Sequence, residues 1–95
     1  MMNSGLSCSP SSGAVRGGTV VDIRHSLSQF LDVPSLACKF GGNGRVLASF
    51  ITGSNILCVA PSAATDGAVT LEVSNNNQDL EGSLSFTYYG ILREI

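Results

Sequence analysis

Apolar and polar residues alternate in short runs along most of this chain, which is the period-two pattern of half-buried β-strands. The cleanest run covers residues 68–73, where Val69, Leu71 and Val73 are predicted to face the core while Thr70 and Glu72 face solvent. Shorter runs predict further inward-facing side chains at Val21, Ile23, Leu36, Cys38, Phe40, Ile56, Cys58, Leu84, Phe86 and Tyr88. No stretch shows a helical period of useful length, so the pattern predicts an all-β chain.

Clusters of glycine, proline, serine and asparagine separate these runs and mark the turns between strands. The turn signals lie at residues 10–13, 17–18, 41–44, 52–54, 61 and 74–82. Residues 45–51 are predicted to form one edge strand. Residues 26–34 are predicted to form an irregular connection, whose Phe30, Leu31 and Val33 could tuck under the sandwich edge. About seven short antiparallel strands at this spacing are typical of a two-sheet β-sandwich.

Length and charge narrow the functional classes. The chain has 95 residues with a formal net charge of −2, and a chain of this length forms one domain. Its five basic residues are scattered, so we expect no nucleic-acid contact, which normally needs a basic surface.

No apolar run reaches the roughly 18–20 residues that span a bilayer. The first residues lack the charged and apolar regions of a signal peptide, so an extracellular domain would be a piece of a longer secreted protein.

Several motifs occur in a fixed order along the chain. They are Gly17-Gly18-Thr19, Cys38-x-Phe40-Gly41, Ile56-x-Cys58-x-x-Pro61, a glycine at position 67 that opens an alternating strand, and Phe86-x-Tyr88. Together they resemble the IPT/TIG domain, the immunoglobulin-like fold shared by plexins, transcription factors and Met-type receptors. The resemblance implies an immunoglobulin-like β-sandwich of the E-set type, with residues 1–95 as a single domain. Its core covers about residues 8–89, and residues 90–95 form a tail or linker.

One loop departs from the family pattern. The family usually follows its second strand with a turn that contains glycine, whereas residues 24–30 contain none. We therefore predict a longer or differently shaped loop there, and we carry over no partner contact from the family to it.

The resemblance implies a non-catalytic role, because family members serve as stalk modules, adhesion surfaces, or dimerisation domains beside DNA-binding domains. We expect a spacer or protein-binding module of a larger cell-surface receptor or secreted protein. We expect it to be monomeric in isolation, without enzymatic activity, cofactor or membrane insertion. An intracellular dimerisation or scaffold domain of a transcription-factor-type protein is the alternative, since fold alone does not choose. A third is an accessory domain of a carbohydrate-active enzyme, which the absence of tryptophan weakens.

The state of the three cysteines indicates whether the domain lies in an oxidising or a reducing compartment. In many extracellular family members the cysteines equivalent to Cys38 and Cys58 look paired, so the resemblance implies a disulfide between them. Such a bond would stabilise the domain by about 3 kcal/mol in the chain-entropy model. The alternative is two buried free thiols that pack as small hydrophobes. Cys8 lies near the predicted domain boundary, where it is either a partly exposed free thiol or a partner for a neighbouring domain.

No set of residues predicts catalysis or metal binding. His25 is the one histidine, and no serine lies in the strained turn that a catalytic nucleophile requires. We therefore predict that His25 is a loop residue. No C-x-x-C pair is present to start a zinc site. The acidic residues that lack the spacing of a calcium loop are Asp32, Asp66, Asp79 and Glu81.

Four apolar residues are predicted to face away from the core. They are Val20, Leu57, Val59 and Tyr89. Because an exposed apolar patch often marks a contact with another domain or chain, these residues are the candidate protein contacts. Ordinary surface scatter, or coverage by residues 26–34, is the alternative.

Overall fold

The computed structural model describes residues 5–27, 30–75, 78–79 and 84–90. Within these ranges it contains strands and one turn of 3-10 helix, η1 (Gly41–Asn43), so the all-β prediction is confirmed. The strands are β1 (Leu6–Ser9), β2 (Ser12–Ala14), β3 (Val20–His25), β4 (Ala37–Phe40), β5 (Arg45–Leu47), β6 (Ser49–Thr52), β7 (Asn55–Val59), β8 (Gly67–Asn75), β9 (Gln78–Asp79) and β10 (Leu84–Tyr89).

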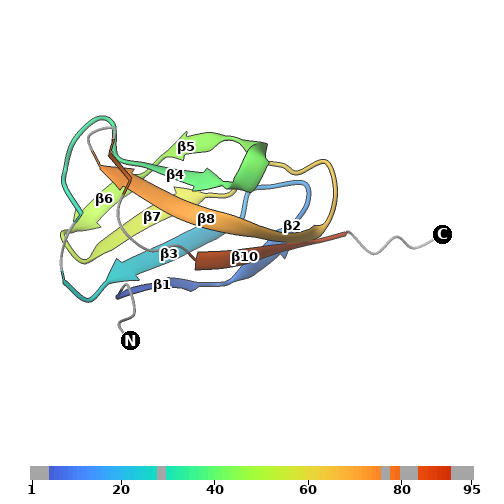
Figure 1. The fold of residues 1–95 in the computed structure, drawn as a ribbon, viewed down its shortest axis with the longest axis horizontal. Coiled ribbons are helices and arrows are strands. Elements are labelled where there is room, and N and C mark those ends of the chain that lie inside the picture. Colours follow the sequence, from blue (N-terminus) through green and yellow to red (C-terminus); the bar gives the residue numbers. More distant parts are fainter. Residues whose placement is uncertain (1–4, 28–29, 76–77, 80–83, 91–95) are drawn as a thin grey trace.

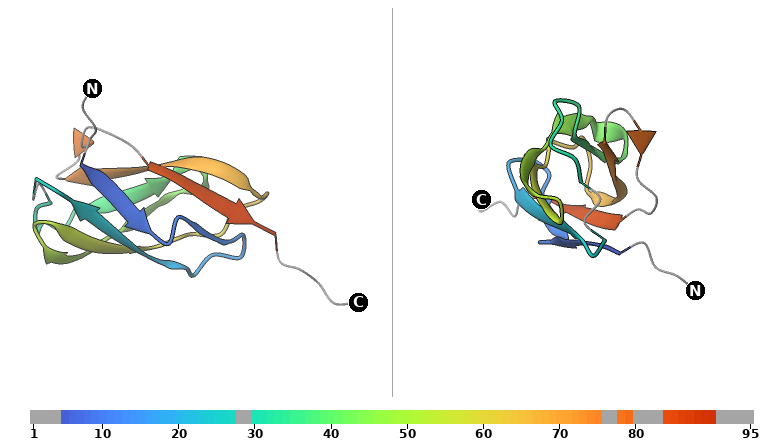
Figure 2. Two further views of the ribbon diagram at one scale, coloured as in Figure 1. Left: turned by 90° about the horizontal axis from the view of Figure 1, so that it is seen from below. Right: turned by 90° about the vertical axis from the view of Figure 1, so that its left-hand side faces the viewer.

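The strands form two sheets that lie face to face (Figures 1 and 2). The four-stranded sheet has the order β1-β3-β7-β6. The six-stranded sheet has the order β2-β10-β8-β4-β5, with β9 paired to β8. Neighbouring strands are antiparallel, except that β2 runs parallel to β10. The predicted β-sandwich is therefore confirmed.

The core lies between the two inner faces, where the alternating residues of both sheets meet. Val21, Ile23 and Ile56 of the four-stranded sheet are fully buried. From the other sheet, Phe40, Phe86 and Tyr88 form a chain of edge-to-face ring contacts with centroids 5.2 and 5.1 Å apart. Of the other residues predicted to face inward, Val69 and Leu84 are half-buried. The rest are buried, namely Leu36, Cys38, Cys58, Leu71 and Val73.

Residues 11–13 do not form the turn that the sequence predicts. Ser12–Ala14 instead pair in parallel with residues 87–89 as β2, so the first segment of the chain contributes a strand to each sheet. Gly13 makes this close approach possible, because a Cβ at this position would overlap the Thr19 hydroxyl and lie 3.0 Å from Cζ of Phe86. The glycine that we interpreted as a turn residue serves packing.

The single edge strand predicted for residues 45–51 is two strands in different sheets. β5 is the edge of the six-stranded sheet, and β6 is the edge of the four-stranded sheet. The chain changes sheets at Ala48, whose N–H donates to the carbonyl of Leu36 at 2.9 Å. This prediction was therefore wrong in its number of strands, and both edges of the sandwich on this side come from one stretch of chain.

Residues 30–36 run along the edge strand β6, and we call them the edge strap. At one end the N–H of Phe30 donates to the carbonyl of Gly53, and at the other the carbonyl of Leu36 accepts from Ala48, each at 2.9 Å. Phe30 is buried and Val33 is half-buried, as the sequence predicts, whereas Leu31 is 49% exposed. The strap is therefore tied to the chain on both sides of β6, at Gly53 and at Ala48.

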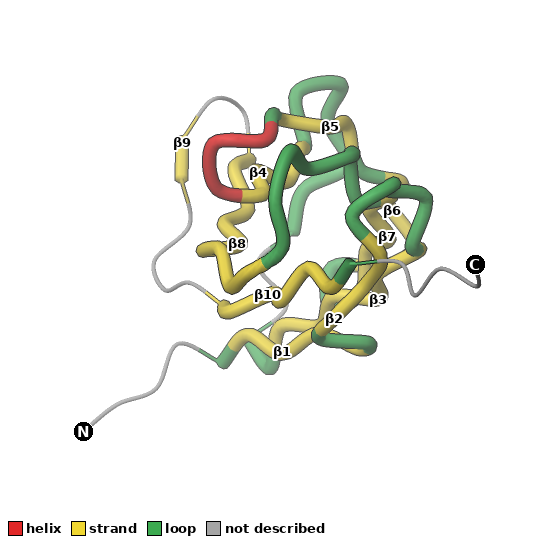
Figure 3. Tube along the Cα trace, turned by 90° about the vertical axis from the view of Figure 1, so that its right-hand side faces the viewer, coloured by secondary structure: helices red, strands yellow, loops and turns green. Residues whose placement is uncertain are grey.

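The described chain enters at one end of the sandwich and leaves at the other (Figure 1). The entry end contains Gly5, whose carbonyl accepts from the N–H of Ser26, and the turn at residues 53–54. The exit end contains the turn at residues 17–18, residues 60–66, and Gly90, which lies beside Asp66. Figure 3 looks onto the exit end and its loops.

Tyr88 fastens the exit end. Its side chain is buried, and its hydroxyl donates to the carbonyl of Pro61 at 2.7 Å. Burial raises the pKa of this hydroxyl above the usual value for tyrosine. Two backbone bonds hold the same segment, from Gly18 to Ala60 at 2.9 Å and from Ala63 to Val15 at 2.8 Å. Residues 60–63 are thus tied to β10 and to the chain that precedes β3.

We expect Tyr88→Phe to lower the free energy of unfolding by about 1 kcal/mol, because the Pro61 carbonyl loses its donor while the buried ring remains. Urea denaturation followed by circular dichroism measures this loss. Tyr89→Phe is the matched control, since Tyr89 is 52% exposed and the same change there should have little effect. An equal loss in both variants would contradict the assigned role of Tyr88.

The raised pKa of Tyr88 adds a dependence on pH. The unfolded chain loses its phenolic proton near pH 10, before the folded one does, so stability should fall as the pH rises above about 10. Tyr88→Phe should remove this part of the alkaline decline. A Cys8→Ser background prevents thiol exchange during the measurement.

Candidate functional site

A disulfide joins the two sheets through the core. The sulfur atoms of Cys38 on β4 and Cys58 on β7 are 2.01 Å apart, and the Cα atoms are 6.4 Å apart. Both residues lie on inward-facing positions of their strands and are buried. The pairing that the family resemblance implies is therefore present, and the alternative of two buried free thiols is not.

The four candidate protein contacts do not share one surface. Val20 on β3 and Val59 on β7 are paired across their strands and are 53% and 50% exposed. Leu57 lies two residues from Val59 on the same outer face, and it is half-buried. Tyr89 is exposed on β10, in the opposite sheet. We call Val20, Leu57 and Val59 the outer apolar patch; whether a partner contacts it stays a prediction.

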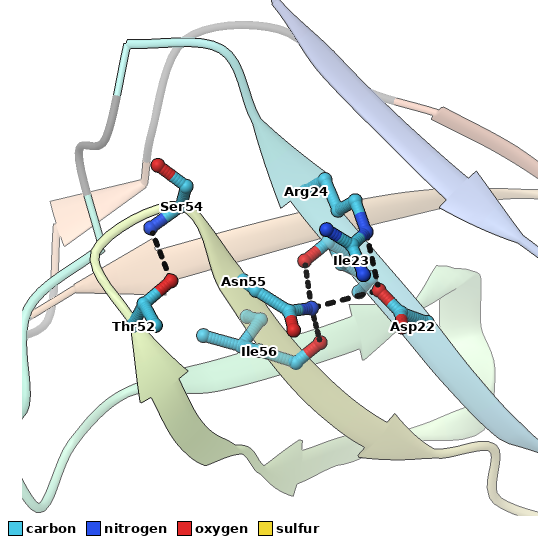
Figure 4. A network of polar contacts seen from close by, with 7 residues as sticks. All are labelled: Asp22, Ile23, Arg24, Thr52, Ser54, Asn55 and Ile56. Carbon is cyan, nitrogen blue, oxygen red and sulfur yellow. Dashed lines mark hydrogen bonds and ion pairs between the residues drawn. The ribbon is translucent and has the colours of Figure 1, made fainter.

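A polar network lies on the same outer face (Figure 4). Asn55 Nδ2 donates to Oδ1 of Asp22 at 2.7 Å and to the carbonyl of Ile23 at 3.2 Å. A longer contact of 3.4 Å reaches the carbonyl of Ile56. Arg24 Nε lies 3.2 Å from the same Oδ1 of Asp22. The network links β3 to the start of β7, and the alternation of apolar residues does not predict it, because that pattern carries no information on side-chain hydrogen bonds.

Cys8 is a free thiol on the edge strand β1, and it is half-buried. Burial raises the pKa of this thiol above its usual value, which keeps it protonated at neutral pH. It lines an open hollow together with Ser7, Ser9, Asp22 and Arg24. The structure thus places Cys8 in a strand within the domain and within reach of solvent.

His25 is not the loop residue that the sequence analysis predicts. It is the last residue of β3 and is only 3% exposed. The signal that could have found it is the alternation Val21, Ile23, His25, which continues the inward face of the strand by one more position. Its ring packs edge to face against Phe30, with centroids 5.8 Å apart.

The acidic candidates remain apart from one another where they can be placed. Asp32 and Asp66 are exposed on different loops. Asp79 belongs to β9, and Glu81 lies outside the described residues. Over the described ranges no three His, Cys, Asp or Glu side chains gather into a group that could hold a metal ion. In the same part of the chain no helix is long and apolar enough to cross a membrane.

The comparison with known proteins adds one match. A family model described as IPT/TIG domain matches residues 6–88. This span runs from the start of β1 into β10 and includes both sheets. A search of curated proteins finds no match to this chain.

The network on the outer face predicts an order of effects. Asn55→Ala should lower the free energy of unfolding by about 1 kcal/mol, because Asn55 links two strands with a bond to a carboxylate. Arg24→Ala should cost less than about 0.5 kcal/mol, since the Arg24 side chain is 65% exposed. Urea titration of both variants beside the wild type measures the order. Equal losses would contradict the assignment of the link between β3 and β7 to the Asn55 amide, because the Arg24–Asp22 ion pair lies within β3.

Proposed function

The chain belongs to the IPT/TIG family, and from this premise we propose that it is a module of a larger cell-surface or secreted protein. In that protein it acts as a spacer and as a protein-binding surface, without catalysis of its own. The family is non-catalytic and immunoglobulin-like, and this supports a structural or binding role.

The observation that carries the proposal is the disulfide between Cys38 and Cys58. Disulfides form and persist in oxidising compartments and are rare in the cytosol. Because the bond crosses the core from one sheet to the other, it also resists separation of the two sheets. A stalk or adhesion module that bears load between neighbouring domains would benefit from this link.

The path of the chain supports the proposed spacer role. The described residues begin beside Ser26 and end beside Asp66, at opposite ends of the sandwich (Figure 1). A module arranged in this way holds its neighbours apart by its own length. The outer apolar patch of Val20, Leu57 and Val59 is the proposed protein contact, because exposed apolar side chains grouped on one sheet favour association.

A second candidate is an intracellular dimerisation or scaffold domain. The exposed pair Val20 and Val59 favours it, because the outer face of the four-stranded sheet could pack on the same face of a second copy. The disulfide argues against it.

Alkylation of the natively sourced protein separates the two candidates. We expect intact mass, after unfolding without reductant in the presence of an alkylating reagent, to show one label, on Cys8. The same sample labelled after reduction is the control and should show labels on Cys8, Cys38 and Cys58. Labels on all three cysteines without reduction would place the protein in a reducing compartment and favour the second candidate.

The oxidised domain should sediment as a monomer over two decades of concentration, since the outer apolar patch alone is small beside a specific dimer interface. Val59→Arg is the matched variant, because it places a charge in the patch at an exposed position. The proposal predicts identical sedimentation of both proteins. A wild-type dimer that Val59→Arg dissociates would support the dimerisation domain instead.

A further inference from the structure

The imidazole of His25 acts as a hydrogen-bond acceptor inside the entry end. The N–H of Leu27 donates to Nδ1 of His25 at 2.9 Å. Nδ1 can accept only while it carries no proton, so the proton of the neutral ring resides on Nε2. His25 is buried, with 3% of its surface exposed to solvent. The entry end is therefore built around a neutral histidine.

Three segments of the chain meet at His25. The N–H of His25 donates to the carbonyl of Ser54 at 3.0 Å, which ties β3 to the turn before β7. The next residue, Ser26, donates to Gly5 at 2.9 Å, which ties it to the start of β1. The ring itself meets Phe30 edge to face at an interplanar angle of 86°. Phe30 begins the edge strap, so the histidine ring supports the end of the strap that bonds to Gly53.

We infer that His25 is an acid-sensitive fastener, whose protonation releases Leu27 and loosens the edge strap from β6. A proton on Nδ1 would set one N–H donor against another, and the bond to Leu27 would be lost. It would also place a positive charge at a buried position, which is costly without a partner. Loosening the strap would expose Phe30, which is 3% exposed in the closed domain.

Few charged groups surround the ring to offset that cost. On β1 the one ionisable side chain is the Cys8 thiol, and the turn at residues 53–54 has none. On the edge strap it is Asp32, which is exposed, so solvent screens its charge. On β3 itself, Asp22 and Arg24 project from the opposite face and pair with each other. Within the described residues no buried carboxylate is placed to stabilise an imidazolium ion.

The sign of the effect follows from this arrangement. The unfolded or locally opened chain accepts the proton freely, whereas the closed entry end opposes it. The open form therefore binds more protons, and the fastening weakens as the pH falls. Histidine is the side chain that changes charge between about pH 5 and 8, so the change is expected in that range.

Amide hydrogen exchange of the wild-type domain tests the inference. From about pH 7.5 to about pH 5, the protection of the Leu27 and Phe30 amides, corrected for intrinsic exchange, should fall by up to about tenfold per pH unit, the limit for one linked proton. The Gly18 amide, which donates to Ala60 at the exit end, is the internal control and should keep its protection.

Two variants isolate the proton. His25→Asn keeps an oxygen acceptor for Leu27 but cannot take up a proton, so protection should be retained and should not depend on pH. His25→Phe keeps a ring against Phe30 without an acceptor, so the Leu27 amide should exchange fast at every pH. If either variant fails to fold, the hydrogen exchange of the wild-type domain still tests the inference.

The inference is overturned by any of three results. Protection of Leu27 and Phe30 that stays constant down to about pH 5 would show that the fastening does not respond to the proton. Protection that falls in parallel with Gly18 would indicate global unfolding. A pH-dependent loss that persists in His25→Asn would assign the proton to another group. None of these outcomes bears on the proposed spacer role, which rests on the disulfide.

Discussion

Each sheet of this domain has one apolar face, and neither face is stable unless the other covers it. The disulfide between Cys38 and Cys58 links the two faces inside the core. Its Cα atoms are 6.4 Å apart, within the range usual for a disulfide. The bond joins β4 of one sheet to β7 of the other, and the rings of Phe40, Phe86 and Tyr88 pack in the same core.

The sequence predicts the core well because a period of two assigns every residue of a strand to one face. It fails where the position of a residue depends on distant parts of the chain. In the sequence Gly13 is typical of a turn, yet it lies in β2, which pairs with β10. Thr19 and Phe86 leave no room there for a larger side chain. The break at Ala48 has no local signal, because the sheet that each half joins is decided by its partners. His25 had a signal, the continued alternation of β3, but its polarity favoured a loop.

The candidate contacts could be assigned from the sequence to the outside of the sandwich but not to one of its two sheets. Val20, Leu57 and Val59 gather on the four-stranded sheet, while Tyr89 lies on the other. A single flat partner surface cannot cover both faces at once. The network around Asn55 shares the outer face with the three apolar residues, so a partner there would meet an apolar patch beside a fixed polar one. That combination favours specific recognition over non-specific hydrophobic association.

The two ends of the domain are fastened by different chemistry. At the exit end, a tyrosine hydroxyl and backbone amides donate to carbonyls, and none of these groups changes its charge between about pH 5 and 8. At the entry end, one of the fastenings is a histidine nitrogen that accepts. Of these fastenings, acid therefore acts on the one at the entry end, while the disulfide still joins the two sheets. A domain built in this way can loosen at its entry end while its centre stays covalently joined.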